Sequence, residues 1–103
     1  MKLCELAKVI RSKNAGPFEL TFDILFDSVE IYRRVKQSKA LSASTFAALY
    51  GIAIADVLCV VEFEPALAIK ITIKRAIPSG SLGDTDVYGA QQHAPLLGLE
   101  ILD

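Results

Sequence analysis

The sequence has no tryptophan, one histidine and one methionine among its 103 residues, and its net charge at pH 7 is only −1. Because positive charge is not in surplus, the composition indicates no general attraction to nucleic acid or to anionic lipid. It contains neither a P-loop nor a GxGxxG motif. The single histidine and two cysteines match no known spacing of metal ligands. We therefore predict no metal, no cofactor and no nucleic-acid partner.

Long hydrophobic runs are also absent. No segment approaches the roughly 20 consecutive apolar residues of a membrane span, and the opening MKLCELAKVIRSKN lacks the shape of a signal peptide. The two cysteines, Cys4 and Cys59, lie far apart within apolar stretches, which favours buried free thiols over a disulfide. We expect a cytoplasmic protein that does not bind a membrane.

Hydrophobic residues nevertheless make up 52% of the chain and charged residues 22%, which is enough to build a packed core. The length predicts a single domain over residues 1–103. Such a domain buries only about two thirds of the surface of its unfolded chain. Pairing with another chain would add to its modest stability.

The hydrophobic pattern predicts strands on both sides of a helical region. Alternation in FELTFDILF and LAIKITIKR is typical of half-buried strands, whereas the continuous apolar run of VLCVVEFE favours a central strand. Ser28 and Ser42 are expected N-caps, and Gly51 is expected where the helical region ends. The predicted order is β (18–27), α (28–51), β (56–64), β (67–75), irregular or α (84–94) and β (97–102).

This order is that of an α+β fold, the ferredoxin-like βαββαβ sandwich, with an extra N-terminal strand. The N-terminal segment, residues 2–10, fits a strand or a helix, and we favour the strand. Right-handed crossovers place the helices on one face of the sheet. The other face must then be solvated or covered by a partner.

A first polar cluster, RSKNAGPF, follows the N-terminal segment. Arg11 has the geometry to bind a carboxylate or a phosphate through two parallel hydrogen bonds. Asn14 and Gly16 tolerate unusual backbone angles, so nearby N–H groups can form an anion-binding nest. The candidate ligand-binding residues are Arg11, Ser12, Lys13, Asn14 and Gly16. The alternative is a polar turn between two β segments, which composition alone favours.

A second cluster lies in PSGSLGDTDVYGAQQHAPLL. Its glycines allow a close approach of backbone to ligand, its aspartates can bind a cation or cap a helix, and its histidine titrates near neutral pH. The candidate ligand-binding residues are Gly83, Asp84, Asp86, Gln91 and His93. The alternative is a long surface loop held by its own side chains, and we weigh the two evenly because long loops are often functional.

No nucleophile with a neighbouring base is evident, so whether the chain is an enzyme stays open. An independent enzyme would use His93 as acid or base, oriented by Asp84 or Asp86. We give this interpretation the least weight.

Three segments carry a resemblance: LCELAKVIRSKNAGPFELTFDILF, FEPALAIKITI and PSGSLGDTDVYGAQQHAPLL. They resemble a small bacterial family catalogued as a domain of unknown function, DUF4387-type, over nearly the whole chain. The family is more distantly similar to the C-terminal ferredoxin-fold domain of AtuA-like (acyclic terpene utilisation) proteins. There an ARSGDKG-type motif stands where Arg11–Gly16 stands here. Gly16 agrees with that motif, whereas Lys13 and Asn14 replace its first glycine and its acidic residue.

The resemblance implies an accessory domain or small subunit that works with a larger AtuA-like chain, in carboxylic-acid or acyl-CoA metabolism. It implies no catalytic residue. In this hypothesis the two polar clusters contribute to a site shared with the larger chain, because the domain is too small to enclose a substrate alone. The alternative is a stand-alone homo-oligomeric module with a small-molecule-binding or regulatory role.

Overall fold

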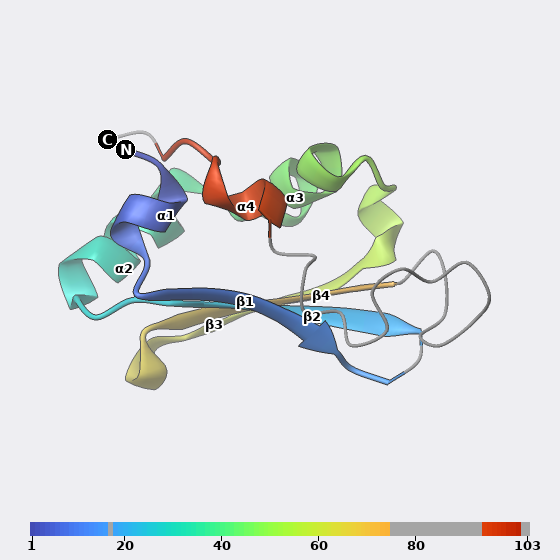
Figure 1. The fold of residues 1–103 in the computed structure, drawn as a ribbon, viewed down its shortest axis with the longest axis horizontal. Coiled ribbons are helices and arrows are strands. Elements are labelled where there is room, and N and C mark those ends of the chain that lie inside the picture. Colours follow the sequence, from blue (N-terminus) through green and yellow to red (C-terminus); the bar gives the residue numbers. More distant parts are fainter. Residues whose placement is uncertain (17, 75–93, 102–103) are drawn as a thin grey trace.

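The computed structural model describes residues 1–16, 18–74 and 94–101 (Figure 1). Along the chain the elements are α1 (Leu3–Leu6), β1 (Val9–Asn14), β2 (Glu19–Leu25), α2 (Val29–Ser38), α3 (Ala43–Tyr50), the short 3-10 helix η1 (Ile54–Asp56), β3 (Val57–Phe63), the 3-10 helix η2 (Glu64–Ala66), β4 (Ala68–Lys74) and α4 (Ala94–Leu97). The predicted mixture of helices and an antiparallel sheet is confirmed.

The four described strands form one antiparallel sheet in the order β1-β2-β4-β3. All four α-helices lie on the same side of this sheet, and the strands present their other side away from the helices (Figure 1). We call this second side the open face. The buried apolar side chains of β2 and β4 point toward the helices and form the floor of the core. They are Leu20, Phe22, Ile24, Ile69, Ile71 and Ile73.

The half-buried alternation predicted for β4 is therefore confirmed, and so are the three predicted helix ends. For β2 the prediction is only partly right: Thr21 and Asp23 are buried as well as the apolar face, and Phe18 lies before the strand and is 59% exposed. The Ser28 hydroxyl accepts a hydrogen bond from the Ile31 amide at the start of α2. Ser42 caps α3 in the same way. Gly51 ends α3 with φ of 65°, a left-handed angle that glycine adopts without steric cost.

Aromatic rings pack the helices onto the sheet. Phe22 of β2 meets Phe46 and Tyr50 of α3 edge to face, with ring centroids 4.9 and 5.1 Å apart. Phe46 and Tyr50 stack on each other at 4.5 Å. Such contacts contribute about 0.5–1.5 kcal/mol each beyond the area they bury. They fix α3 above the centre of the sheet.

The N-terminal prediction is partly wrong. Residues 2–10 contain the short helix α1 and only the first two residues of β1, so the strand begins later and extends to Asn14. The first half of the first polar cluster, Arg11–Asn14, is consequently strand and not turn. The hairpin of β1 and β2 explains this, because six consecutive residue pairs join Val9–Asn14 to Leu20–Leu25.

The predicted final strand over residues 97–102 is also wrong in its described part. Leu97 ends α4, and Glu100 forms only an isolated bridge with Lys2. The Leu3 amide donates to the Leu99 carbonyl at 2.7 Å, and the Ile101 amide to that of Met1 at 2.8 Å. The end of the chain therefore pairs with its beginning, because β1 already occupies the sheet position beside β2. The predicted helical or irregular segment 84–94 lies outside the described residues, except for residue 94, which begins α4.

A third correction concerns β3, which is predicted as a central strand and lies at the edge of the sheet. The chain turns at η2 and returns as β4, which inserts between β2 and β3. Leu58, Val61 and Phe63 remain exposed. An apolar, β-branched run shows that a strand is suited to burial, but not which neighbours bury it.

No helix among residues 1–16, 18–74 and 94–101 is long and apolar enough to cross a membrane.

The Tyr32 hydroxyl on α2 is buried and has no hydrogen-bond partner among the described residues. We predict that Tyr32→Phe raises the free energy of unfolding by about 1 kcal/mol. The reason is that the Tyr32 hydroxyl loses its hydrogen bonds to water on folding and gains none from the described residues in return. Tyr32→Leu is the control: it also removes the ring that packs on Phe26 and should lower stability. Urea denaturation at neutral pH measures both. A less stable Tyr32→Phe protein would show that the hydroxyl is bonded.

The same residue makes stability depend on pH. Burial raises the pKa of Tyr32 from its usual 10.0, and the negative charges of Glu62 and Glu64 raise it further. Above pH 10 the unfolded chain releases a proton that the folded chain retains, so stability should fall as pH rises. Burial raises the pKa of Tyr50 as well, so Tyr32→Phe should remove only part of this decline.

Candidate functional site

The first polar cluster is divided between the two faces of the sheet. Arg11 lies opposite Asp23 and Lys13 opposite Thr21, and these four side chains belong to the open face. Ser12 lies opposite the buried Phe22, on the helix side. Successive side chains of a strand point to opposite faces. The structure therefore keeps Arg11 and Lys13 together and separates them from Ser12 and Asn14.

Asp23 is the centre of the open face. The Arg11 Nε donates to its Oδ2 at 3.2 Å, the Lys13 Nζ lies 3.7 Å from the same oxygen, and the Lys70 Nζ lies 3.9 Å from Oδ1. Register explains this arrangement, because Arg11, Asp23 and Lys70 are direct cross-strand neighbours on β1, β2 and β4. We call these four residues the basic cluster.

Burial differs sharply within the basic cluster. The Asp23 side chain is only 6% exposed, whereas each of the three cationic side chains is more than half exposed. One carboxylate faces three cations, so the cluster carries an excess of two positive charges. The terminal guanidinium nitrogens of Arg11 make no hydrogen bond to a described residue. They can receive an anion in the paired geometry that carboxylates and phosphates favour.

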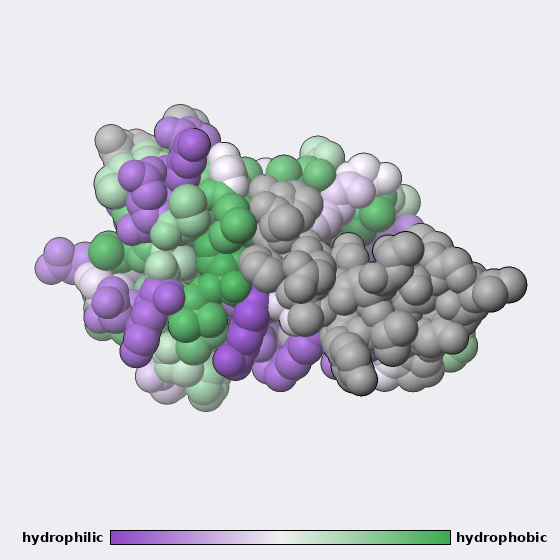
Figure 2. Space-filling model, viewed as in Figure 1, coloured by the Kyte–Doolittle hydropathy of each residue, from purple (hydrophilic) through white to green (hydrophobic). Residues whose placement is uncertain are grey.

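A hollow of about 370 Å³ adjoins the basic cluster on the open face. Its other lining residues are apolar and come from three strands and η2: Leu25, Val61, Phe63, Ala66 and Ala68. Phe63 is 55% exposed, which is unusual for a large aromatic side chain. In Figure 2 hydrophilic side chains extend below the sheet, on the side of the open face, next to hydrophobic surface. The hollow thus suits a group that combines negative charge with an apolar body.

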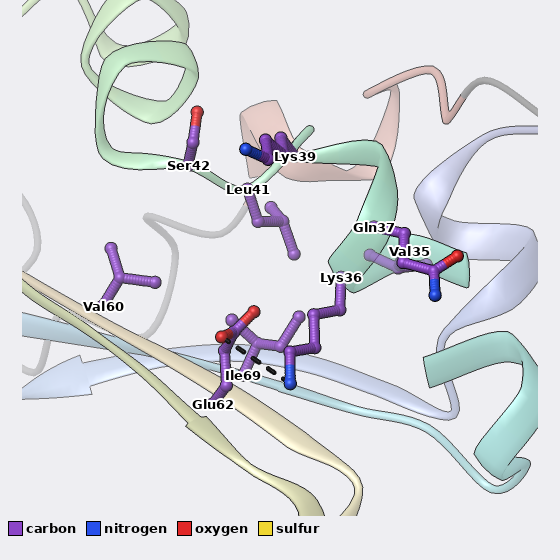
Figure 3. Close-up of a pocket in the computed structure, with 9 residues that line it drawn as sticks. All are labelled: Val35, Lys36, Gln37, Lys39, Leu41, Ser42, Val60, Glu62 and Ile69. Carbon is purple, nitrogen blue, oxygen red and sulfur yellow. Dashed lines mark ion pairs between the residues drawn. The ribbon is translucent and has the colours of Figure 1, made fainter. Parts of the chain in front are cut away.

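A second hollow, of about 450 Å³, lies on the helix side between α2, the connection from α2 to α3, and the strands β3 and β4 (Figure 3). Val35, Leu41, Val60 and Ile69 form its apolar floor, and polar side chains of α2 and of the connection between α2 and α3 stand at its rim. Lys36 and Glu62 face each other across it at 4.0 Å. We call it the helix-side crevice.

One N–H group in the region of the predicted anion nest is already bonded within the hairpin. The Ala15 amide donates to the Glu19 carbonyl at 3.0 Å, which closes the hairpin between β1 and β2. Asn14 belongs to β1. Gly16 does adopt φ of 90°, a left-handed angle, so glycine is needed there for the turn. Of the second cluster, Gly83, Asp84, Asp86, Gln91 and His93 lie outside the described residues.

The prediction of buried cysteines is wrong, because Cys4 and Cys59 are both exposed free thiols. Cys4 lies between the buried Leu3 and Leu6 of α1, and Cys59 is on the edge strand β3. Apolar sequence neighbours do not bury a side chain that points away from the core. Within the described part of the chain, no three histidine, cysteine or acidic side chains gather to hold a metal.

Sequence reasoning missed Asp23, Lys70, Val61 and Phe63 as parts of the site. The alternation of FELTFDILF does place Asp23 on the outer face of its strand. What the sequence lacks is the register that sets Arg11 and Lys70 on either side of Asp23. If residues 9–14 are taken as a strand, the sequence places one acidic residue, Asp23, on a strand between two strands that carry basic residues. That pattern would indicate a charged site on one face of the sheet.

Removing the negative charge of Asp23 would leave three neighbouring cations without a counter-charge, so they would repel one another. We predict that Asp23→Asn lowers the free energy of unfolding by about 1 kcal/mol, and that the loss shrinks in high salt because salt screens the repulsion among the exposed cations. Asp27→Asn is the control, since Asp27 is exposed and makes no ion pair with a described residue. Urea denaturation at low and high salt measures both. Equal stability of the two variants would contradict the role given to Asp23.

Comparison with known proteins adds a family but no function. No curated protein and no solved structure gives a significant match to this chain. The family model described as "Domain of unknown function (DUF4387)" matches residues 3–100, which include every described strand and helix. The chain therefore belongs to the DUF4387 family.

Proposed function

We propose that this chain is a small accessory subunit that docks its open face on a larger AtuA-like protein. The observation that carries the proposal is the composition of the open face. It combines the basic cluster with exposed apolar side chains, Val61 and Phe63, around one hollow. A mixed patch of this kind, with an exposed aromatic residue, is typical of interaction surfaces.

The hollow on the open face favours a partner over a ligand bound by this chain alone. Small-molecule sites bury about 70–90% of their ligand and are concave. Here the lining residues come from one side of a single sheet and the turn η2, so a second surface is needed to close the hollow. A larger chain that covers the open face would supply it.

Charge indicates what the partner presents. Three cations and one carboxylate leave the basic cluster with an excess of two positive charges. A complementary surface carries a carboxylate or another anion beside an apolar patch. Arg11 would bind that anion through its terminal nitrogens, and Phe63 would pack against the apolar part. The anion comes either from the partner or from a carboxylic-acid or acyl-CoA substrate held between the two chains.

The AtuA-like partner is inferred from the resemblance of the three segments quoted above. The fold supports the same relation. The succession of β2, the pair α2 and α3, β3 and β4 supports this proposal, because it is compatible with the first four of the six elements of the ferredoxin-like order. We infer that β1 takes the edge position that a C-terminal strand holds in that fold.

Charge reversal on the open face tests the docking. We predict that the double variant Arg11→Glu with Lys70→Glu binds a purified AtuA-like protein at least about tenfold more weakly than the wild-type chain does, because it opposes the anion on the partner. Lys2→Glu with Lys39→Glu is the matched control: it reverses two exposed lysines on the helix side, neither of which makes an ion pair with a described residue. Isothermal titration calorimetry at low salt measures both. If the wild-type chain does not bind the larger protein, the proposal fails.

The stand-alone binding module remains the second candidate, and the helix-side crevice favours it. Its volume of about 450 Å³ lies within the range of small-molecule sites. If the isolated chain binds a carboxylate, coenzyme A or a nucleotide, that compound should raise its melting temperature by mass action. A Lys36→Gln variant should lose the shift, because Lys36 is a cation at the rim of the crevice. A flat response to all three classes would leave only the accessory subunit.

A further inference from the structure

The edge strand β3 has the composition of a strand covered on both sides, yet no element in the described part of the chain pairs with its outer edge. Its seven residues, VLCVVEF, include one charged side chain, no lysine and no proline. Within the described part of the chain, no backbone hydrogen bond joins β3 to any element besides β4. Proteins normally protect edge strands with charges, prolines or bulges, because an open edge pairs with other strands.

One protecting device is present, and it defines which part of β3 is open. The register of β3 on β4 shifts between Val57 and Cys59, so Leu58 is a bulge. A bulge interrupts regular pairing at that end of the strand. The regular stretch is Cys59–Phe63, five residues that pair without interruption with β4. Its middle residue is Val61, which is 46% exposed.

We propose that β3 pairs antiparallel with β3 of a second copy of this chain, about a two-fold axis at Val61. This pairing places Val61 opposite Val61 and Cys59 opposite Phe63, all on the open face. On the helix side it places Val60 opposite Glu62. The only charged residue of the strand thus never faces its own copy, so the strand is self-complementary in charge and in hydrophobicity.

The charges nearby favour this two-fold arrangement over face-to-face pairing. The basic cluster lies on β1, β2 and β4, so β3 separates it from the second copy. Two interposed β3 strands would hold the Lys70 residues about 14 Å apart at an interstrand spacing of about 4.8 Å, beyond the reach of unscreened repulsion in physiological salt. Face-to-face pairing of two open faces would instead bring the basic clusters together.

The second copy would also complete a site. Val60 and Glu62 line the helix-side crevice on the side where β3 forms the edge. The pairing sets Glu62 of the second copy opposite Val60, so each crevice gains a carboxylate from the other chain. The resulting sheet of eight strands presents two basic clusters on one continuous open face, which is available for the docking proposed above.

The oligomeric state of the chain alone tests this inference, without the larger protein. We expect sedimentation equilibrium to show a dimer whose dissociation constant rises at least about tenfold in Val61→Lys, because two lysines would then face each other across the axis. Val29→Lys is the matched control: Val29 is a valine of nearly equal exposure, 43%, at the start of α2. A wild-type monomer at every concentration overturns the inference but leaves the proposed accessory role standing.

Cross-linking tests the register and does not depend on a destabilising charge. In a Cys4→Ser, Cys59→Ser, Val61→Cys protein, facing Cα atoms about 4.5–5.5 Å apart fit a disulfide, so mild oxidation should link the dimer. In Cys4→Ser the native Cys59 residues lie four positions out of register, about 13 Å apart along the strand, and should not link. A dimer that links through Cys59, or through neither position, overturns the pairing at Val61.

Discussion

The one-sided covering of the sheet is the constraint on which the rest of this structure depends. All four α-helices lie on one face, where Phe22, Ile24 and Ile71 are buried against them. The other face has no helix among the described residues to bury it, so its side chains must satisfy one another or meet solvent. The basic cluster and the exposed Phe63 both follow from this. A sheet with two covered faces would have had no place for either.

Cross-strand register then turns scattered polar residues into a site. Arg11, Asp23 and Lys70 are 12 and 47 positions apart along the chain and become direct neighbours because β2 pairs with β1 on one side and β4 on the other. A buried carboxylate without cations would be costly, and three cations without a carboxylate would repel one another. The arrangement holds the cations in place and still leaves net positive charge toward solvent.

Local sequence patterns predicted those elements whose neighbours along the chain decide their form. The helix caps at Ser28 and Ser42 and the left-handed residue Gly51 depend on hydrogen bonds within a few residues, so the sequence identifies them. The alternation of β4 likewise follows from burial of one face, whereas β2 is buried on both faces because Asp23 and Thr21 are covered by side chains of neighbouring strands. Predictions that needed a distant partner failed. The final segment pairs with Met1–Leu3 instead of the sheet, and β3 lies at an edge although its composition suits the centre.

The sequence by itself determined that this chain is a mixed helix and sheet protein, which residues of β2 face the core, and that Arg11 and Lys13 carry charge near the N-terminus. Only the tertiary structure decided that these two cations share one face with Asp23 and Lys70 while Ser12 points to the other, and that the apolar strand β3 is left at the edge. The physical reason is that side-chain periodicity is a local property of the backbone. Which strands become neighbours, and in what register, is settled by the free energy of the whole packed domain.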